Sequence, residues 1–205
     1  MKRFFITGID TGVGKTITSV AICASGIADY WKPVQAGNLE NTDTDVIRKL
    51  TDKFGVVCHD EAFRLKMAAS PHIAAKNENV SIRISKFKLP DTDNHIVIEG
   101  AGGLMVPLND NEYMIDLISA LNSEIILVIN NYLGSINHSL LSLKIIENYN
   151  LKLKGLVFCG STQLSSEEYI ISHSPVKNIW RIPRGEVLDF SFINTVSKQF
   201  ITLWD

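Results

Sequence analysis

A glycine-rich segment near the start of the chain carries the residue types that hold nucleotide phosphates. Gly12 and Gly14 precede Lys15 and Thr16, and a short apolar run, residues 4–6, comes before them. In a strand, loop and helix arrangement, glycine backbone lets N–H groups close on phosphate oxygens. Lys15 would add a positive charge near the β- and γ-phosphates, and the Thr16 hydroxyl can bind Mg²⁺. The segment therefore predicts a phosphate-binding loop.

The spacing of this loop departs from the common pattern by one residue. The nearest upstream glycine is Gly8, whereas the common pattern has a glycine at the position of Ile9. A plain glycine-rich turn is the alternative, but the intact G-K-T after an apolar strand favours the phosphate loop. We expect nucleotide contacts from six consecutive residues: Gly12, Val13, Gly14, Lys15, Thr16 and Ile17.

A second glycine-rich segment follows another apolar run. Glu99 comes directly after residues 96–98, and an acidic residue at the end of a buried strand is the usual Mg²⁺-side partner of a phosphate loop. Gly100, Ala101 and Gly102 then let the backbone pass close to a phosphate or a substrate. The alternative is a glycine-rich turn with a buried, hydrogen-bonded carboxylate. We expect Glu99 to bind the metal and these four residues to contact the nucleotide.

Lys32 stands at the end of another expected strand. Pro33 stops strand pairing after it and favours an ordered loop. Beside a triphosphate, a fixed cation there can hold phosphoryl charge; a solvated surface lysine is the alternative. Asp43 and Asp45 come next along the chain. Either can cap a helix, and either can complete a Mg²⁺ shell with the loop hydroxyl and the strand-end carboxylate, so the residues leave both assignments open.

Two helix starts offer backbone N–H groups to an anion. Ser70 and Pro71 are residue types preferred at a helix N-cap and first turn, and an ordinary capped helix is the alternative there. Gly134 and Ser135 open a long helix after the apolar run 125–129. Asn137 in its first turn can donate a hydrogen bond to a carboxylate held at the positive end of the helix.

Apolar runs alternate with helix-like stretches along the chain. Strands are expected at residues 3–7, 30–34, 95–99, 124–129, 153–159 and 178–182, and helices at 15–25, 44–53, 71–76, 113–121, 135–149, 165–172 and 191–203. The runs 95–98 and 125–129 are continuously apolar, which is typical of strands covered on both faces. The pattern predicts a single α/β domain over residues 1–205, with one doubly wound, mostly parallel sheet flanked by helices. Ligands bind at the carboxyl ends of such strands, where the charged residues above are expected.

The composition gives no sign of a nucleic-acid or membrane binder. The chain has 205 residues, of which 45% are hydrophobic and 20% charged, and its net charge is −2, so no electrostatic attraction to anionic polymers is expected. Cys23, Cys58 and Cys159 lie far apart, and three reduced thiols in a cytoplasmic protein are expected. Neither a signal peptide nor a membrane span is expected.

Five segments together resemble the dethiobiotin synthetase family of ATP-dependent enzymes of biotin biosynthesis. They are residues 7–16, 31–34, 70–75, 97–108 and 133–138, in the family's order. The resemblance implies a P-loop fold, ATP as co-substrate and Mg²⁺ as cofactor. It implies that CO₂ (from bicarbonate) and 7,8-diaminononanoate form a carbamate, that ATP phosphorylates it, and that ring closure gives dethiobiotin. It also implies a homodimer whose interface builds the site for the substrate carboxylate.

The family's functional residues carry over onto matching positions of this chain. Lys32 and Lys15 would be catalytic, and the metal ligands would be Thr16, Asp45 and Glu99. Asp45 is preferred to Asp43 because T-D-V before a helical pattern matches the family better. The substrate would contact eight positions: Lys32, Ala36, Ser70, Pro71, Leu133, Gly134, Ser135 and Asn137.

Two departures from the family pattern affect binding. Ala36 stands where a serine or threonine is expected, and the neighbouring Gln35 or Gly37 amide is the expected replacement. Cys159-Gly160 ends a strand where the family often has an Asn-Asp pair that recognises adenine, and a thiol substitutes poorly for an amide. We therefore expect weaker adenine selectivity, with base contacts shifted to the backbone near four residues: Gly160, Ile182, Pro183 and Arg184.

A nucleotide-dependent switch of the partitioning or septum-positioning kind is the alternative function. Such proteins share the fold and the loop, but they carry an additional lysine early in the loop, where this chain has Asp10. They also tend to present a basic or amphipathic surface, which the net charge of −2 does not favour. From its place in the loop, Asp10 is expected to pair with Lys32 in the empty site.

Overall fold

A computed structural model describes residues 1–26, 28–185 and 187–204. The strands are β1 (Arg3–Gly8), β2 (Ala28–Trp31), β3 (Val34–Ala36), β4 (Cys58–His59), β5 (Phe63–Leu65), β6 (His95–Glu99), β7 (Glu124–Asn130), β8 (Leu153–Cys159) and β9 (Ile179–Ile182). Within the described residues, seven of them form one sheet in the order β4-β2-β6-β1-β7-β8-β9, and β3 pairs with β5 in a separate two-stranded sheet. All the strand pairs are parallel, so the carboxyl ends of the main sheet share one edge.

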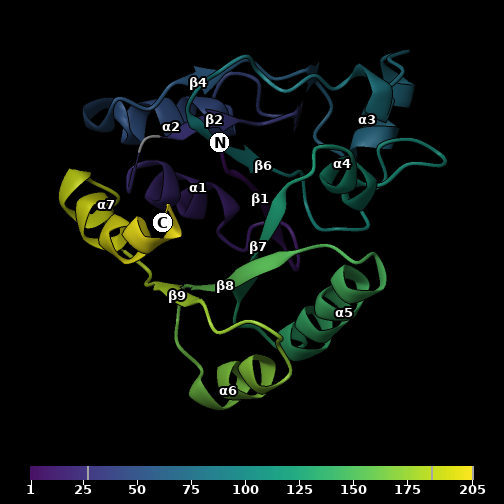
Figure 1. Cartoon of the computed structure of the whole chain (residues 1–205). Helices are drawn as coiled ribbons and strands as arrows, with labels where there is room; N and C mark the ends of the chain where they lie inside the picture. Colours follow the sequence, from purple (N-terminus) through teal and green to yellow (C-terminus); the bar gives the residue numbers. More distant parts are fainter. Residues whose placement is uncertain (27, 186, 205) are drawn as a thin grey trace.

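Helices cover both faces of the main sheet (Figure 1). The α-helices are α1 (Lys15–Cys23), α2 (Asp43–Leu50), α3 (Pro71–Asn77), α4 (Met114–Ala120), α5 (Ser135–Asn148), α6 (Leu164–Ser172) and α7 (Phe190–Ser197), and the 3₁₀ helices are η1 (Asp52–Phe54), η2 (Ile84–Lys86) and η3 (Lys198–Leu203). One apolar layer lies between the sheet and α1, α2 and α7, and the other between the sheet and α4, α5 and α6. Figure 1 shows α1 and α7 on one side of the strands and α5 on the other.

The central strands explain this double cover. Along β1, Phe4 and Ile6 belong to the layer under α1, whereas Phe5 belongs to the opposite layer. All three side chains are fully buried, because successive residues of a strand point to opposite faces. β7 alternates in the same way. The prediction of a doubly wound parallel sheet is confirmed.

Three expected elements differ in detail. The strand expected at 30–34 is divided, because Lys32 and Pro33 leave the main sheet between β2 and β3. The helices expected at 44–53 and 191–203 each pass into a 3₁₀ turn, η1 and η3. The short strands β4 and β5 were not predicted from the sequence.

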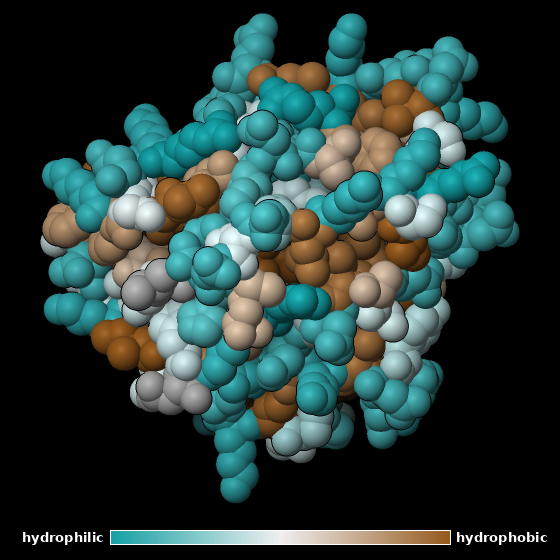
Figure 2. Space-filling model, turned by 45° about the horizontal axis from the view of Figure 1, so that its top comes forward, coloured by the Kyte–Doolittle hydropathy of each residue, from teal (hydrophilic) through white to brown (hydrophobic). Residues whose placement is uncertain are grey.

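Polar side chains cover most of the face drawn in Figure 2, and hydrophobic groups gather in smaller patches toward its middle. In the described part of the chain, no helix has the length and hydropathy that a membrane crossing requires. The three cysteines are free thiols, as expected.

Candidate active site

The phosphate loop joins β1 to α1. Gly14 is the N-cap of α1, with a φ of 105°, a left-handed conformation that glycine adopts easily. A Cβ atom at this position would lie 2.8 Å from both Cβ and Sγ of Cys159. Lys15 Nζ donates to the carbonyl of Asp10 at 2.9 Å, which folds the lysine back over the loop. The loop therefore presents the N–H groups of a helix start and an ammonium group to the same space.

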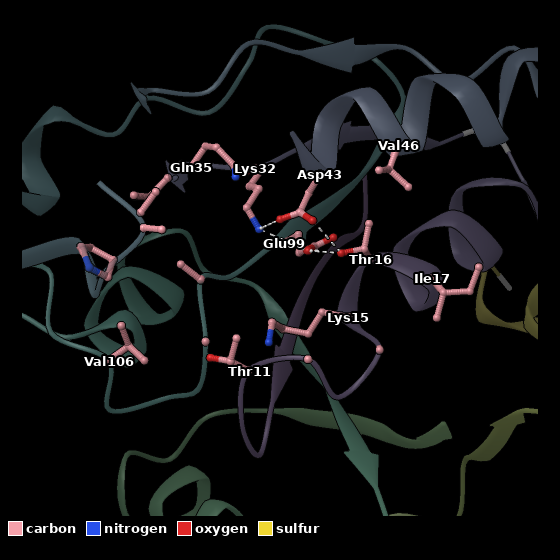
Figure 3. A pocket seen from close by; sticks show the side chains of 18 of the residues that line it. Thr11, Lys15, Thr16, Ile17, Lys32, Gln35, Asp43, Val46, Glu99 and Val106 are labelled. Carbon is pink, nitrogen blue, oxygen red and sulfur yellow. Dashed lines mark hydrogen bonds and ion pairs between the residues drawn. The ribbon is translucent and has the colours of Figure 1, made fainter. Parts of the chain in front are cut away.

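Glu99 ends β6 and is the centre of the charged cluster in Figure 3. Its side chain is 1% exposed. Oε1 accepts from Thr16 Oγ1 at 3.0 Å and from Lys32 Nζ at 3.2 Å. Oε2 accepts from Ser19 Oγ at 2.8 Å and from Tyr30 OH at 3.1 Å. Four donors thus fix this buried carboxylate, as a desolvated charge requires.

Lys32 follows β2 and points into the same cluster. Its Nζ lies 2.6 Å from Asp43 Oδ2 and 3.2 Å from Glu99 Oε1. Burial alone would lower the pKa of Lys32, but the two carboxylates outweigh burial and raise it. Burial lowers the pKa of Lys15, against the opposing pull of Glu99. The surface-lysine alternative for Lys32 is therefore wrong, since its ammonium is buried and ion-paired.

Asp43, and not Asp45, belongs to this cluster. Thr16 Oγ1 also lies 3.1 Å from Asp43 Oδ1. Asp45 instead closes a capping box at the start of α2, accepting from the Thr42 N–H at 3.0 Å and the Thr42 hydroxyl at 2.8 Å. It also pairs with Arg48 on the surface at 3.3 Å. The expectation that Asp45 joins Thr16 and Glu99 is therefore wrong in this structure, where Asp43 lies beside Thr16 and Lys32 instead.

The oxygen atoms of Thr16, Asp43 and Glu99 suit Mg²⁺ in type and number. Mg²⁺ prefers hard oxygen ligands and is usually held by one or two carboxylates together with phosphate oxygens and water. The Thr16 hydroxyl lies within 3.1 Å of an oxygen of each carboxylate, so the three groups converge on one point. Among the described residues no group of three or more His, Cys, Asp or Glu side chains forms an all-protein metal cage. The cluster therefore fits a metal that is shared with a nucleotide.

A cavity of about 780 Å³ opens over this cluster. Most of the expected nucleotide, metal and substrate residues line it: Gly12, Gly14, Lys15, Thr16, Ile17, Lys32, Ala36, Ser70, Pro71, Glu99, Ala101 and Gly102. Residues that the sequence did not single out complete its wall, among them Thr11, Val46, Leu50 and Leu188. One cavity thus joins the phosphate loop to the segments expected to bind substrate.

Gly100 lies behind the wall of this cavity. Its N–H donates to the carbonyl of Ile6 at 2.9 Å, and a Cβ atom at Gly100 would lie 2.7 Å from a ring carbon of Phe5. The N–H is therefore occupied within the sheet, and a nucleotide contact from Gly100 does not fit the structure.

The start of α5 also lies outside the cavity. Leu133, Gly134 and Asn137 are exposed, whereas Ser135 is buried, and none of the four lines the 780 Å³ cavity. The structure of one chain does not bring these residues to Lys32.

A second cavity, of about 540 Å³, adjoins the phosphate loop at the ends of β7, β8 and β9. Its lining includes the remaining expected nucleotide residues, Val13, Gly160, Ile182, Pro183 and Arg184, and it shares Gly12, Gly14 and Ile17 with the first cavity. Burial raises the pKa of Cys159 in its wall to about 11, against an opposing hydrogen bond with Thr18. The thiol is therefore protonated near neutral pH and makes a weak polar contact at most.

Two asparagines at the end of β7 line this second cavity and were missed from the sequence. The amide of Asn130 lies beside Gly160, where a Cβ atom would be 3.3 Å from Asn130 Oδ1. Asn131 Nδ2 donates to Glu167 Oε1 at 2.7 Å and to the Ser161 carbonyl at 2.9 Å. Their position directly after a buried strand was the available signal. The structure thus places an amide next to the glycine that replaces the family's usual side chain.

Asp10 does not pair with Lys32. Its Oδ1 accepts from the Thr11 N–H at 2.7 Å, and its carbonyl holds Lys15. Lys32 is instead satisfied by Asp43 and Glu99. The expected Asp10–Lys32 pair is therefore wrong in this structure.

The parallel sheet, the glycine loop before α1 and the acidic strand end define a P-loop nucleotide-binding α/β protein. Solved structures with this fold include the MinC:MinD cell division complex of Aquifex aeolicus (TM-score 0.58, 15% identity, covering 100% of this chain and 95% of that one). A plasmid partition protein of Borrelia burgdorferi bound to AMPPNP is also similar (TM-score 0.56, 13% identity, 99% and 97% covered). At such low sequence identities, these similarities establish the fold and nothing about function.

Sequence relatives show the family. A family model described as an AAA domain matches residues 2–191. The ATP-dependent dethiobiotin synthetase BioD of Cytophaga hutchinsonii is 43% identical over 205 residues, covering 100% of this chain and 99% of the relative. The enzymes of the same name from Agrobacterium fabrum (40% identity, 99% and 96% covered) and Chlamydia pneumoniae (37%, 100% and 91%) are also similar. The chain belongs to the dethiobiotin synthetase family.

Proposed function

We propose that this protein is an ATP-dependent dethiobiotin synthetase. In the proposed reaction, one amine of 7,8-diaminononanoate adds to CO₂ and forms a carbamate. A carbamate oxygen attacks the γ-phosphorus of ATP, which releases ADP. The second amine then attacks the carbamate carbon, phosphate leaves with one oxygen from CO₂, and a cyclic urea results. The observation that carries the proposal is the convergence of Lys15, Thr16, Glu99 and Lys32 on one cavity.

The phosphate loop would hold the triphosphate of ATP. The N–H groups at the start of α1 point toward this space, and Lys15 adds a charge that lies within reach of the β- and γ-phosphates. Thr16, Asp43 and Glu99 would hold Mg²⁺, which neutralises phosphate charge when it is bound. The second cavity adjoins the loop at Gly12 and Gly14, so we assign it to the nucleobase and ribose.

Lys32 would act on the carbamate and on the phosphoryl group in transfer. Its raised pKa keeps the ammonium charged near neutral pH, and a fixed charge in a water-poor site stabilises developing negative charge strongly. In the structure this charge is held by Asp43 and Glu99. Asp43 and Glu99 would hold the metal, and Lys32 Nζ would then be free to contact the carbamate oxygens.

The carboxylate end of the substrate would be held by the start of α5 of a second copy. Leu133, Gly134 and Asn137 are exposed and lie outside the cavity of their own chain, which is consistent with a site that is complete only in a homodimer. The positive end of a helix of this length suits a carboxylate. Mass measurement of the native assembly, with and without the diamine, tests this part.

A single incubation tests the function. The protein is mixed with Mg-ATP, bicarbonate and 7,8-diaminononanoate, and the products are analysed by mass spectrometry. We expect the cyclic urea together with ADP, and no urea from a Lys32→Ala variant. ATP hydrolysis without urea would refute the proposal and favour the nucleotide-dependent switch.

A further inference from the structure

Gln35 contributes an unused hydrogen-bond acceptor to the catalytic cavity. It lies on β3, three residues after Lys32, and only 5% of it is exposed. It lines the same cavity as Lys32, Ala36 and Ser70, and Figure 3 shows it next to Lys32. The sequence left open whether its amide or that of Gly37 replaces the hydroxyl missing at Ala36.

The orientation of the Gln35 amide is set by its neighbour. Nε2 donates to the carbonyl of Gly37 at 2.9 Å. Because a carbonyl oxygen only accepts, the nitrogen of the amide must face it, and Oε1 must face away. The carbonyl is itself fixed, since Gly37 has a φ of 75° and packs so closely on Ala68 that a Cβ atom would not fit. The position and the orientation of the Gln35 amide are thus fixed by its contacts within the fold.

Oε1 of Gln35 is buried and has no hydrogen-bond partner among the described residues. Native structures rarely leave such an acceptor unpaired, and Gln35 is one of the residues that line the cavity. A donor brought by a ligand would recover the lost interaction.

Other polar groups near this point are already engaged. Ser70 Oγ lies 3.0 Å from His72 Nδ1, and the Thr16 hydroxyl lies within 3.1 Å of both Asp43 and Glu99, to one of which it donates. Ala36 offers no hydroxyl at the position where the family resemblance leads one to expect it. Of the buried side-chain atoms that lack a hydrogen-bond partner in the described residues, Gln35 Oε1 is the one whose residue lines this cavity.

We propose that Gln35 Oε1 accepts a hydrogen bond from an amino group of the diamine and positions that amine for attack. The inference rests on the proposed function and names the residue that recognises the amine end of its substrate. An uncharged acceptor suits this task, because an amine must be neutral to attack CO₂ or the carbamate carbon. A carboxylate at the same place would favour the ammonium form, raise the pKa of the amine and suppress its reactivity.

The first test replaces Gln35 with methionine, which keeps the length of the side chain and removes both polar atoms. We expect the KM for the diamine to rise by about tenfold or more, the effect of one lost hydrogen bond to a buried group. The KM for ATP should stay within about twofold of the wild-type value, since Gln35 is not expected to contact the phosphates. Gln163→Met is the matched control, because Gln163 is exposed before α6 and lines neither cavity. An unchanged KM for the diamine in Gln35→Met would overturn the inference.

The second test measures binding rather than turnover, in wild type and in Gln35→Met. Binding of 7-aminononanoate and of 8-aminononanoate is compared with binding of the diamine by calorimetry. We expect one monoamine to lose about tenfold or more in affinity and to bind wild type and Gln35→Met equally, as a double-mutant cycle requires. If both monoamines lose the same affinity in the variant, Oε1 does not contact a particular amine and the inference fails.

The third test uses pH. In Gln35→Glu, the new carboxylate should hold the amine in its ammonium form, so kcat/KM should fall near neutral pH and recover as the pH is raised. A loss that is the same at every pH would indicate a structural effect and contradict the inference. Wild-type protein must first make the cyclic urea; if it makes none, the proposed function itself fails, and the two failures are distinguished.

Discussion

Asp43→Ala and Asp45→Ala form a matched pair that separates the metal site from the helix cap. Both substitutions remove a carboxylate from the first turn of α2, so their effects on helix propensity are the same. In the structure, Asp43 contacts Lys32 at 2.6 Å and Thr16 at 3.1 Å, whereas Asp45 contacts the backbone and hydroxyl of Thr42. We therefore expect the two variants to fail in different ways.

For Asp43→Ala, the main effect should be on the Mg²⁺ requirement. One of three protein oxygens of the proposed site is lost, so half-saturating Mg²⁺ should rise by about 10–100-fold, the range known for partners in metal sites. Breaking a fully buried ion pair costs about 3–5 kcal/mol. Here the loss of stability should be smaller, about 1–2 kcal/mol, because solvent screens the charge of Asp43 and because Lys32 retains its ion pair with Glu99. The side chain of Asp43 is 35% exposed and Glu99 lies 3.2 Å from Lys32 Nζ.

For Asp45→Ala, the main effect should be on stability alone. Loss of the capping box should lower the free energy of unfolding by about 0.5–2 kcal/mol, and the Mg²⁺ requirement should not change. The assay measures the rate at which the cyclic urea product forms as a function of Mg²⁺ concentration. The stability of each variant is measured separately by denaturation in urea solutions. A raised Mg²⁺ requirement in Asp45→Ala, with a normal one in Asp43→Ala, would refute the reasoning.

Three further predictions concern single groups. Tyr30→Phe removes the 3.1 Å hydrogen bond to Glu99 and should lower the free energy of unfolding by about 1.5–3 kcal/mol, as bonds to buried charges do; urea denaturation measures it, and no loss would contradict the bond. Burial alone would raise the pKa of Asp29, but hydrogen bonds from Thr92, Asn94 and His59 lower it. The ionised Asp29 carboxylate therefore stabilises the fold above pH ~4, and this stabilisation is lost as the pH falls through the lowered folded-state pKa. Thermal unfolding from pH 3 to 7 should therefore show a flatter acid limb in Asp29→Asn than in wild type, and parallel curves would count against it. Cys159 cannot form the hydrogen bonds that distinguish adenine, whereas the Asn130 amide can pair with the amino edge of either adenine or cytosine. The kcat/KM values for formation of the cyclic urea with ATP and with CTP should therefore agree within about tenfold. A strong preference for ATP would show that another group recognises adenine.

The sequence alone located the core of the site because its residues follow buried strands. Glu99 comes after a run that reads as a strand covered on both faces, and Lys15 comes after a strand and glycines. Parallel strands bring such positions to one edge of the sheet, so their convergence in one cavity could be predicted without coordinates. The fold class could be predicted from the same continuously apolar runs.

The choice between Asp43 and Asp45 was made on the family resemblance, because T-D-V before a helical pattern matches the family better. The helix itself was expected to start at Thr44. In the structure Thr42 is the N-cap, which moves Asp45 to the third helical position, where it closes the capping box, and turns Asp43 toward Lys32. Helix ends are uncertain by one or two residues in sequence patterns, and one residue was enough to exchange the two roles.

Other features lay beyond sequence patterns for physical reasons. The strands β4 and β5 have two and three residues, too few to show a period. The amide of Asn130 lies beside Gly160 because β7 pairs with β8. The amide of Gln35 is held by the Gly37 carbonyl, and Gly37 in turn packs on Ala68, far away in the sequence. The start of α5 does not line the 780 Å³ cavity of its own chain, so a pattern within one chain could not place these residues at the candidate site.

The destination of the oxygen atoms of CO₂ tests the central claim most directly. The protein is given ¹⁸O-labelled bicarbonate, unlabelled Mg-ATP and the diamine, and the released phosphate is analysed by mass spectrometry within one turnover. Attack of a carbamate oxygen on the γ-phosphorus beside Lys32 predicts one ¹⁸O in each phosphate and one in the carbonyl of the urea. Phosphate without ¹⁸O, formed together with the urea, would contradict phosphorylation of the carbamate at this site.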